Sequence, residues 1–279
     1  MTTIKSLYRR IVPEKIRMFI AKRGIVNYAI SNGIKFDVVP HWFWKNFNNG
    51  KWEPDTIKFY RKYVSPVKEV IDIGGWIGPS MLAAYSCNPL KIHVIEADPA
   101  SYQVLKKNTL NNYLNDKVEL FNICIGDKNN EIVSFGFMDK NIIDTSVKGI
   151  NETGVGVITI TLMDFLKTKD MNKINIIKID AEGAEQYMGE GLKYISQFAD
   201  IIVLISIHTP FWNDKPETAN MLMKQFRRYD IFTDKEEPIT EDELMEKMLN
   251  SSPTRFKDKT GKIFTLILKT NLNKCRNDF

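Results

Sequence analysis

The sequence predicts an α/β fold built on a doubly wound, mostly parallel sheet. From residue 68 onward, short apolar segments alternate with helical stretches, and a glycine-bearing turn separates the first strand from its helix. Parallel strands with helices on both faces are near-continuous apolar runs, as these segments are. The 279 residues, 43% hydrophobic and 26% charged, suffice for a proper core and exclude collagen-like, disordered and disulfide-scaffold classes.

Apolar runs and turn residues place the elements along the chain. The expected strands cover residues 68–73, 92–95, 118–125, 132–135, 157–161, 174–179, 201–207 and 263–268, with a weak one near residue 231. The expected helices cover residues 80–86, 99–111, 162–168, 184–196 and 216–228. Proline opens two of these helices, at positions 99 and 216, and proline suits a first helical turn.

The first sixty residues are expected to form helices and loops, including a basic amphipathic helix after Pro13. We therefore divide the chain into an N-terminal helical extension, residues 1–64, and a second domain, residues 65–279. Three widely spaced cysteines support neither a zinc site nor a disulfide framework.

The net charge of +5 is unevenly distributed along the chain. Residues 1–23 carry seven basic side chains and one acid, and residues 255–279 carry seven basic side chains and two acids, which leaves the body acidic. An acidic body argues against a nucleic-acid partner, whereas basic ends suit an anionic membrane surface. Because no signal peptide or long apolar run is present, we expect a cytoplasmic protein, with peripheral membrane contact through the basic N-terminus left open.

The first strand runs into a turn with the sequence Asp72-Ile-Gly-Gly-Trp-Ile-Gly78. Glycines let the backbone approach a ligand, and the following helix offers free N–H groups. Glu96 ends the next strand, where an acid can bind both hydroxyls of a ribose. Asp72 would repel a pyrophosphate but favour a cationic amino or sulfonium group, as in S-adenosylmethionine. The alternative is that Asp72 and Glu96 only cap the turn and the next helix.

Four segments carry a family resemblance, and they occur in this order: Ile71-Asp-Ile-Gly-Gly-Trp-Ile-Gly78, Val94-Ile-Glu-Ala-Asp-Pro99, Val157-Ile-Thr-Ile-Thr-Leu-Met-Asp164 and Lys178-Ile-Asp-Ala-Glu-Gly-Ala-Glu185. Together they resemble the FkbM family of S-adenosylmethionine-dependent O-methyltransferases, over about residues 68–209. The resemblance implies a class I methyltransferase (Rossmann-like) sheet of seven strands, one of them antiparallel. It also implies that the glycine turn holds the methionine part of the cofactor and that Glu96 holds the ribose. The chain departs from the family at Ser206, where an acid is common.

The reacting groups are expected where the strands beside the glycine turn end. Methyl transfer to a hydroxyl needs an oxygen aimed at the methyl carbon and a group that removes its proton. His208 is the first candidate for this general base, because histidine titrates near neutral pH, and Asp180 is the second. Glu182 completes the expected catalytic set. A strand-end histidine with hydrogen bonds and no chemistry is the alternative for His208.

The remaining site residues are assigned by the same logic. The expected cofactor-binding residues are Asp72, Gly74, Gly75, Gly78, Glu96, Asn122 and Asp180. Trp212 and Glu185 are the expected substrate contacts, and Lys178 is expected to pair with Asp180 or Glu182. A divalent metal ion is compatible with these carboxylates and the histidine, but the spacing does not require one.

The expected activity is transfer of a methyl group to a hydroxyl, with a sugar in a glycan, glycolipid or glycosylated metabolite as the favoured acceptor. A nucleic-acid methyltransferase is the second hypothesis, although the chain lacks the Asn/Asp-Pro-Pro-aromatic and Pro-Cys elements of such enzymes. A methyltransferase-like binding module without catalysis is the third, and the departure at Ser206 is its only motive. The sequence leaves the acceptor, the metal requirement and the oligomeric state open.

Overall fold

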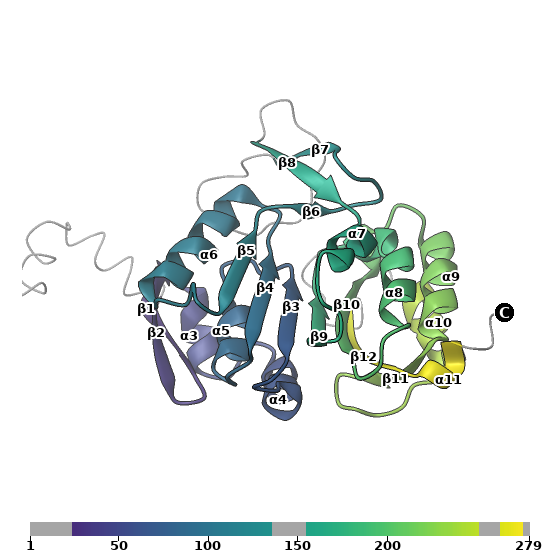
Figure 1. The fold of residues 1–279 in the computed structure, drawn as a ribbon, viewed down its shortest axis with the longest axis horizontal. Coiled ribbons are helices and arrows are strands. Elements are labelled where there is room, and N and C mark those ends of the chain that lie inside the picture. Colours follow the sequence, from purple (N-terminus) through teal and green to yellow (C-terminus); the bar gives the residue numbers. More distant parts are fainter. Residues whose placement is uncertain (1–23, 136–154, 251–262, 276–279) are drawn as a thin grey trace, which may run out of the picture.

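A computed structural model describes residues 24–135, 155–250 and 263–275 (Figure 1). Seven strands form the central sheet, in the order β11-β12-β10-β9-β3-β4-β5. Their bounds are β3 (Glu69–Ile73), β4 (Lys91–Ile95), β5 (Val118–Phe121), β9 (Ile174–Ile179), β10 (Ile202–His208), β11 (Tyr229–Thr233) and β12 (Ile263–Thr270). The strands from β10 to β5 pair in parallel, while β12 is antiparallel to both β10 and β11. The predicted doubly wound sheet with one antiparallel strand is therefore confirmed.

Helices cover both faces of this sheet, which is why β3 is buried on both of its faces. Ile71 and Ile73 join one hydrophobic cluster, whereas Val70 joins the other. The first cluster includes side chains of α7 (Leu162–Lys167), α8 (Gly189–Ile195), α9 (Lys215–Phe226) and α10 (Glu241–Asn250). The second includes side chains of α3 (Phe43–Asn48), α4 (Pro54–Tyr63), α5 (Pro79–Tyr85) and α6 (Pro99–Asn111).

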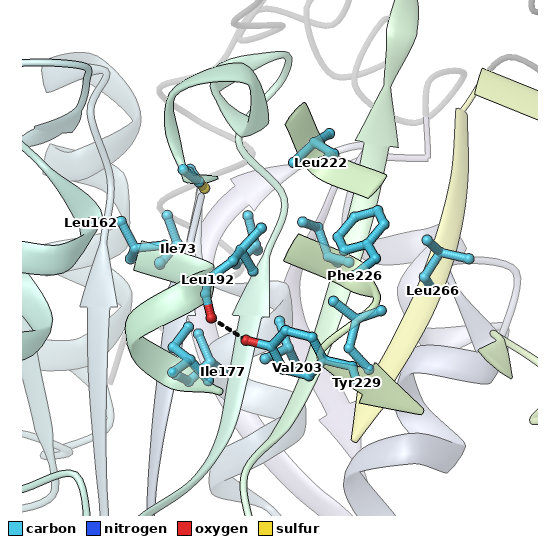
Figure 2. Close-up of a cluster of buried hydrophobic side chains, with 14 of the residues drawn as sticks. Ile73, Leu162, Ile177, Leu192, Val203, Leu222, Phe226, Tyr229 and Leu266 are labelled. Atoms are coloured by element: carbon cyan, nitrogen blue, oxygen red, sulfur yellow. Dashed lines mark hydrogen bonds between the residues drawn. The ribbon is translucent and has the colours of Figure 1, made fainter. Parts of the chain in front are cut away.

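The first cluster is densely packed around the middle of the sheet (Figure 2). Ile177 and Val203 project from neighbouring parallel strands against Leu192 of α8. The buried hydroxyl of Tyr229 donates a hydrogen bond to the Leu192 carbonyl, so the one polar atom of that side chain is satisfied. This side of the sheet is thus a rigid support for the strand ends described below.

The segment before β3 differs from the prediction. Instead of helices alone, it contains a β-hairpin of β1 (Val26–Ser31) and β2 (Ile34–His41), followed by α3 and α4. Asn32 and Gly33 at its tip have φ values of 47° and 79°, which the two-residue hairpin turn requires. The Asn-Gly pair between alternating apolar residues was the sequence signal for this turn. The expectation of helices and loops is wrong for residues 26–41, which form this hairpin. The amphipathic helix expected after Pro13 lies outside the described residues.

The extension packs on the sheet and shares its core. Phe36 of β2, Trp44 of α3 and Tyr60 of α4 lie in the same hydrophobic cluster as Val70 and Met81. The proposed boundary between residues 64 and 65 stays a prediction, but the two parts have a continuous apolar interior.

Smaller departures concern the other elements. The strand expected over residues 118–125 divides into β5 and β6 (Cys124–Ile125), and β6 joins β8 (Val155–Ile160) and β7 (Ile132–Phe135) in a separate three-stranded sheet. This small sheet projects from the top of the view in Figure 1. The helix expected over residues 184–196 divides into a 3-10 turn, η1 (Ala184–Tyr187), and α8. A second such turn, η2 (Thr209–Phe211), follows β10, and α11 (Leu272–Cys275) follows β12. In the described parts of the chain, no helix is long and apolar enough to cross a membrane.

The ends of β3 and β9 approach each other closely, and a glycine makes this approach possible. The Asp180 amide donates to the Ile73 carbonyl over 2.9 Å. A Cβ atom placed on Gly74, whose φ is +86°, would lie 1.8 Å from the Asp180 carbonyl oxygen. The Asp180 carbonyl belongs to the backbone and cannot move aside as the end of a flexible side chain could, so only glycine fits at position 74.

Gly74→Ala is expected to reduce the free energy of unfolding by about 3–5 kcal/mol, because overpacking adds to the cost of a positive φ. Gly33→Ala is the matched control: its φ is +79°, yet nothing lies within 4 Å of its added Cβ. It should cost only about 1–2 kcal/mol. Urea denaturation of both variants measures the difference, and equal losses would contradict the steric argument.

Candidate active site

A buried lysine lies at the centre of the charged residues on the α4–α5 face of the sheet. Lys178 of β9 is the register partner of Asp72 of β3, so the two side chains share one face of neighbouring parallel strands. The Lys178 Nζ lies 3.7 Å from Asp72 Oδ1 and 3.1 Å from Asp180 Oδ2. Its side chain is only 3% exposed. The predicted pairing of Lys178 with Asp180 is present, and Asp72 adds a second carboxylate.

The charged groups on this face shift each other's pKa values. Burial alone would lower the pKa of the Lys178 ammonium, but Asp180 and then Asp72 hold it above its ordinary value. Burial alone would raise the pKa of Asp180, yet Lys178 and His208 bring it well below its usual range. Lys178 and Asp180 are therefore an ionised pair at neutral pH.

His208 is held between two carboxylates at the end of β10. Its Nε2 lies 3.3 Å from Asp180 Oδ1, and its Nδ1 lies 2.6 Å from Glu185 Oε1. The second oxygen of Glu185 accepts a hydrogen bond of 3.1 Å from Trp212 Nε1. A histidine that faces a carboxylate on each ring nitrogen can donate to both only as an imidazolium. Lys178, Asp180, His208 and Glu185 thus form a chain of alternating charges.

This arrangement weighs against His208 as the general base. Burial alone would lower the pKa of its imidazole, but the hydrogen bonds to Asp180 and Glu185 raise the pKa to about 11. An imidazolium at neutral pH has no lone pair with which to take a proton. Asp180, whose side chain is 22% exposed, is ionised but is a weak base because of its low pKa. The structure therefore favours an orienting role for His208 and Asp180.

The expected substrate contacts, Glu185 and Trp212, are withdrawn into the interior. Glu185 is 0% exposed and Trp212 is 7% exposed, and each is bonded to the other. Glu185 instead fixes His208, and Trp212 fixes Glu185. The burial of both side chains weighs against the prediction that they contact substrate. Glu182 is half-buried and has a φ of 48°, in the turn that leads from β9 into η1.

The glycine turn after β3 is fixed by backbone hydrogen bonds and by Glu96. The amides of Gly74 and Gly75 both donate to the Ile95 carbonyl over 2.9 Å. The Trp76 amide donates to Glu96 Oε2 over 2.6 Å, and the Asp98 amide donates to Glu96 Oε1 over 2.7 Å. Predicted cofactor residues on β3 and β4 are thus brought together, as the sequence analysis expects.

Two further cofactor candidates, Gly78 and Asn122, surround this turn. Gly78, with a φ of +100°, precedes α5, and an added Cβ would meet Leu105 at 3.0 Å. Asn122 donates hydrogen bonds to the carbonyls of Glu96 and Ala97, so it fixes the chain that carries Glu96. Burial raises the pKa of Glu96 to about 7, although the two backbone donors act in the opposite direction.

The N-terminal segment brings residues to the site that the sequence did not predict. Glu53, at the start of α4, interacts electrostatically with Asp180, Lys178 and Asp72. Phe43 packs edge-on against Trp76 of the glycine turn, with ring centroids 4.7 Å apart. No motif marks Glu53 in the sequence, and the density of aromatic residues around it was the only signal that this segment packs closely.

The sheet order, the glycine turn and the acidic end of β4 together define a class I methyltransferase. The methyltransferase FkbM domain matches residues 72–230, which is more than half of the chain. The chain belongs to this family of S-adenosylmethionine-dependent methyltransferases. The predicted family is thereby confirmed.

Solved structures give weaker likenesses. Methyltransferase FkbM from Methylobacillus flagellatus KT is 13% identical, with 76% of this chain and 50% of that chain covered and a TM-score of 0.44. An rRNA methylase from Streptococcus thermophilus is 8% identical (77% and 93% covered, TM-score 0.44). A TehB-like SAM-dependent methyltransferase from Corynebacterium glutamicum is 7% identical (82% and 95% covered, TM-score 0.42). None of the three carries an argument about the acceptor. No curated protein matches the chain.

The residues around the turn fit S-adenosylmethionine. Glu96 places a buried carboxylate at the end of β4, where its remaining lone pairs can accept bonds from ribose hydroxyls. Among the residues that the structure describes, neither oxygen of the buried Asp72 has a hydrogen-bond partner. An unsatisfied carboxylate beneath the turn favours a cationic ligand, although Lys178 offsets part of its charge.

A metal ion finds less support in this geometry. In the ranges that the structure describes, no group of three or more His, Cys, Asp or Glu side chains is arranged to hold a metal ion.

His208 is expected to carry a proton on both ring nitrogens at pH 8, because its pKa is raised from 6.5 to about 11. Long-range ¹H–¹⁵N correlation spectra report this state directly, and His208→Gln assigns the signal among the three histidines. A neutral imidazole at pH 8 would contradict the charge network.

His208→Gln should also reduce the free energy of unfolding, by about 3–5 kcal/mol, because it leaves the buried Glu185 carboxylate without its cation. A pKa that is higher in the folded chain gives stability that is full below pH 6.5 and is lost as the pH rises through about 11. The difference between the two proteins in urea denaturation should therefore be smaller at pH 9 than at pH 6. A pH-independent difference would count against the ion pairs.

Proposed function

We propose that this protein transfers the methyl group of S-adenosylmethionine to a hydroxyl of a sugar-containing acceptor, in a glycan, glycolipid or glycosylated metabolite. Its membership of the FkbM methyltransferase family supports methyl transfer. The observation that carries the choice of a hydroxyl is the partly exposed end of the charge chain, at Asp180, whose side chain is 22% exposed. An ionised carboxylate at the end of β9 can accept a hydrogen bond from a hydroxyl and so aim its oxygen.

The residues of this chain have distinct tasks in the proposal. When bound, the cofactor supplies an electrophilic methyl group on a sulfonium. Glu96 and the glycine turn hold the cofactor, and Asp180 orients the acceptor hydroxyl. Lys178 and His208 keep the Asp180 carboxylate ionised and fixed, because each is a cation within 3.3 Å of one of its oxygens. Glu185 in turn fixes His208.

A base amine of a nucleic acid is the less favoured acceptor. The basic residues are concentrated at the two ends of the chain, whereas the body, which contains the site, is acidic. A polyanion would be repelled by such a body. The charge distribution therefore supports a small or lipid-linked acceptor.

Asp180→Asn is expected to lower turnover by about 100-fold or more, because the amide is a poorer acceptor for the substrate hydroxyl. The assay follows S-adenosylhomocysteine release over a panel of sugar nucleotides, lipid-linked glycans, and tRNA and rRNA fragments, each with and without EDTA. Asp170→Asn is the matched control, since this acid is exposed, forms an ion pair with Lys173 and accepts a hydrogen bond from the Asn172 amide; its turnover should be unchanged.

Calorimetry should show that Asp180→Asn still binds S-adenosylmethionine, which separates lost chemistry from lost folding. Turnover with the RNA fragments alone would contradict the proposed acceptor class. Cofactor binding without turnover on any acceptor would favour a binding module without catalysis.

We also propose a cytoplasmic location with peripheral contact to anionic membranes through the basic residues 1–23, which lie outside the described part of the chain. The protein should sediment with phosphatidylserine-containing vesicles at 50 mM salt and be released at high salt, because the contact is electrostatic. A chain shortened to residues 24–279 is the control and should stay in the supernatant. Equal sedimentation of both would argue against the N-terminus as the contact.

A further inference from the structure

The proposed methyl transfer leaves one task without a residue, which is removal of the hydroxyl proton. His208 is an imidazolium at neutral pH, and the low pKa of Asp180 makes its carboxylate a weak base. A residue for this task lies outside the matched family domain of residues 72–230, and its assignment rests on the proposed function.

Glu53 occupies an unusual backbone position immediately before α4. Its φ of 33° and ψ of 61° place it in the left-handed region. A glutamate is rare there, and the following Pro54 restricts it further. Such a conformation costs about 1–3 kcal/mol and persists only where the surroundings enforce it, often at functional sites.

Contacts of α4 fix Glu53 relative to the glycine turn. The buried hydroxyl of Tyr60 on α4 bonds over 2.7 Å to Ser80 Oγ, which lies on α5 directly after the turn. Thr56 Oγ1 donates to Glu53 Oε2 over 3.0 Å. The carboxyl group of Glu53 is thus held by its own helix, and that helix is bonded to the helix that follows the glycine turn.

The charged groups around Glu53 suit it to exchange a proton near neutral pH. Burial is the main cause that raises its pKa to about 7; Asp180 and Asp72 act in the same direction, while Lys178 and the Thr56 hydrogen bond oppose them. Tyr60 is the other titratable neighbour, and burial keeps it neutral by raising its pKa well above 10. A base is most effective when its pKa is close to the working pH.

Glu96 has a pKa that is raised to a similar value, but its geometry differs. Each of its two oxygens accepts a backbone amide, from Trp76 and from Asp98, and these bonds fix the glycine turn. Both oxygens of Glu96 are therefore engaged in fixing the turn that would hold the cofactor. Among the charged groups that act on Glu53, Asp180, the residue that orients the acceptor, has the largest effect.

We propose that Glu53, contributed by the N-terminal segment, is the general base of the reaction. Its carboxylate takes the proton from the acceptor hydroxyl while that oxygen forms its bond to the methyl carbon and the methyl–sulfur bond breaks. The products are the methyl ether, S-adenosylhomocysteine and a neutral Glu53 carboxylic acid, which then loses its proton to solvent. Asp180 and Glu53 divide the work: one orients the hydroxyl, and the other deprotonates it.

The first test is Glu53→Gln, which keeps an oxygen for the Thr56 hydrogen bond. The matched control is Asp55→Asn, because Asp55 lies on the same segment and pairs with Lys58. Turnover is measured from pH 5.5 to 9 with S-adenosylmethionine and the sugar nucleotide of highest activity in the panel. We expect Glu53→Gln to lose about 100-fold or more in kcat, with less than a threefold change in the Kd of S-adenosylmethionine. Asp55→Asn should stay within twofold.

The pH profile separates a base from a structural residue. For the unaltered protein, kcat should rise with pH and level off above about 7, the pKa of Glu53. Glu53→Gln should lack this step. Glu53→Gly, which also relieves the positive φ, should fold at least as stably and regain at least tenfold of its lost turnover on addition of formate. A Glu53→Gln variant that keeps its turnover within tenfold, or that keeps the pH step, would overturn the proposal.

A readout without acceptor distinguishes this proposal from the proposed function. In protein labelled with ¹³C at the glutamate carboxyl carbons, two resonances should titrate near pH 7, from Glu53 and Glu96, and Glu53→Gln should remove one of them. Failure to find that resonance overturns the role of Glu53 alone. Absence of turnover by the unaltered protein on every acceptor overturns the proposed function, whatever the titration shows.

Discussion

The burial of one ammonium group organises the whole site. Lys178 lies inside a parallel sheet, where an unpaired charge would be prohibitively costly, so Asp72 and Asp180 must stand beside it. Asp180 can then lie close to His208, and His208 requires Glu185 as a second partner. Each buried charge in this series is stabilised by an opposite charge beside it. The series runs from Lys178 in β9 to Glu185 behind β10.

Much of the fold could be predicted from the sequence because buried parallel strands correspond to continuous apolar runs. The segments that became β3, β4, β9, β10 and β12 were located to within two residues, and the antiparallel β12 follows from the family resemblance. The hairpin of β1 and β2 was missed although Asn32-Gly33, between alternating apolar residues, marks its turn. Periodicity also gave no sign that α8 would be separated from η1.

The sequence predicted which strand-end residues would lie together, but neither their charge states nor the contribution of Glu53. Strand ends placed Asp180 and His208 together, since parallel strands end at the same edge. Their charge states depend on Glu185 and Lys178, and those contacts arise from distances that a sequence does not contain. Trp212 shows the same limit: an aromatic side chain after a strand suggests a sugar platform, but its indole bonds to Glu185 in the interior.

Glu53 shows that the motifs of the family domain do not include every residue that lies at the site. The segment before β3 packs through Trp44 and Tyr60 into the apolar cluster under the sheet. Residues of that segment therefore have fixed positions relative to β9, even though the matched family domain starts at residue 72.

The glycine turn has a thermodynamic consequence for ligand capture. Its amides at Gly74, Gly75 and Trp76 are already bonded to Ile95 and Glu96, so the loop has lost its conformational freedom before any ligand arrives. A nucleoside entering this loop has no backbone disorder to remove, and the entropic penalty of binding is confined to its own immobilisation and that of a few side chains. The conformational entropy of this loop is thus lost on folding and not on binding.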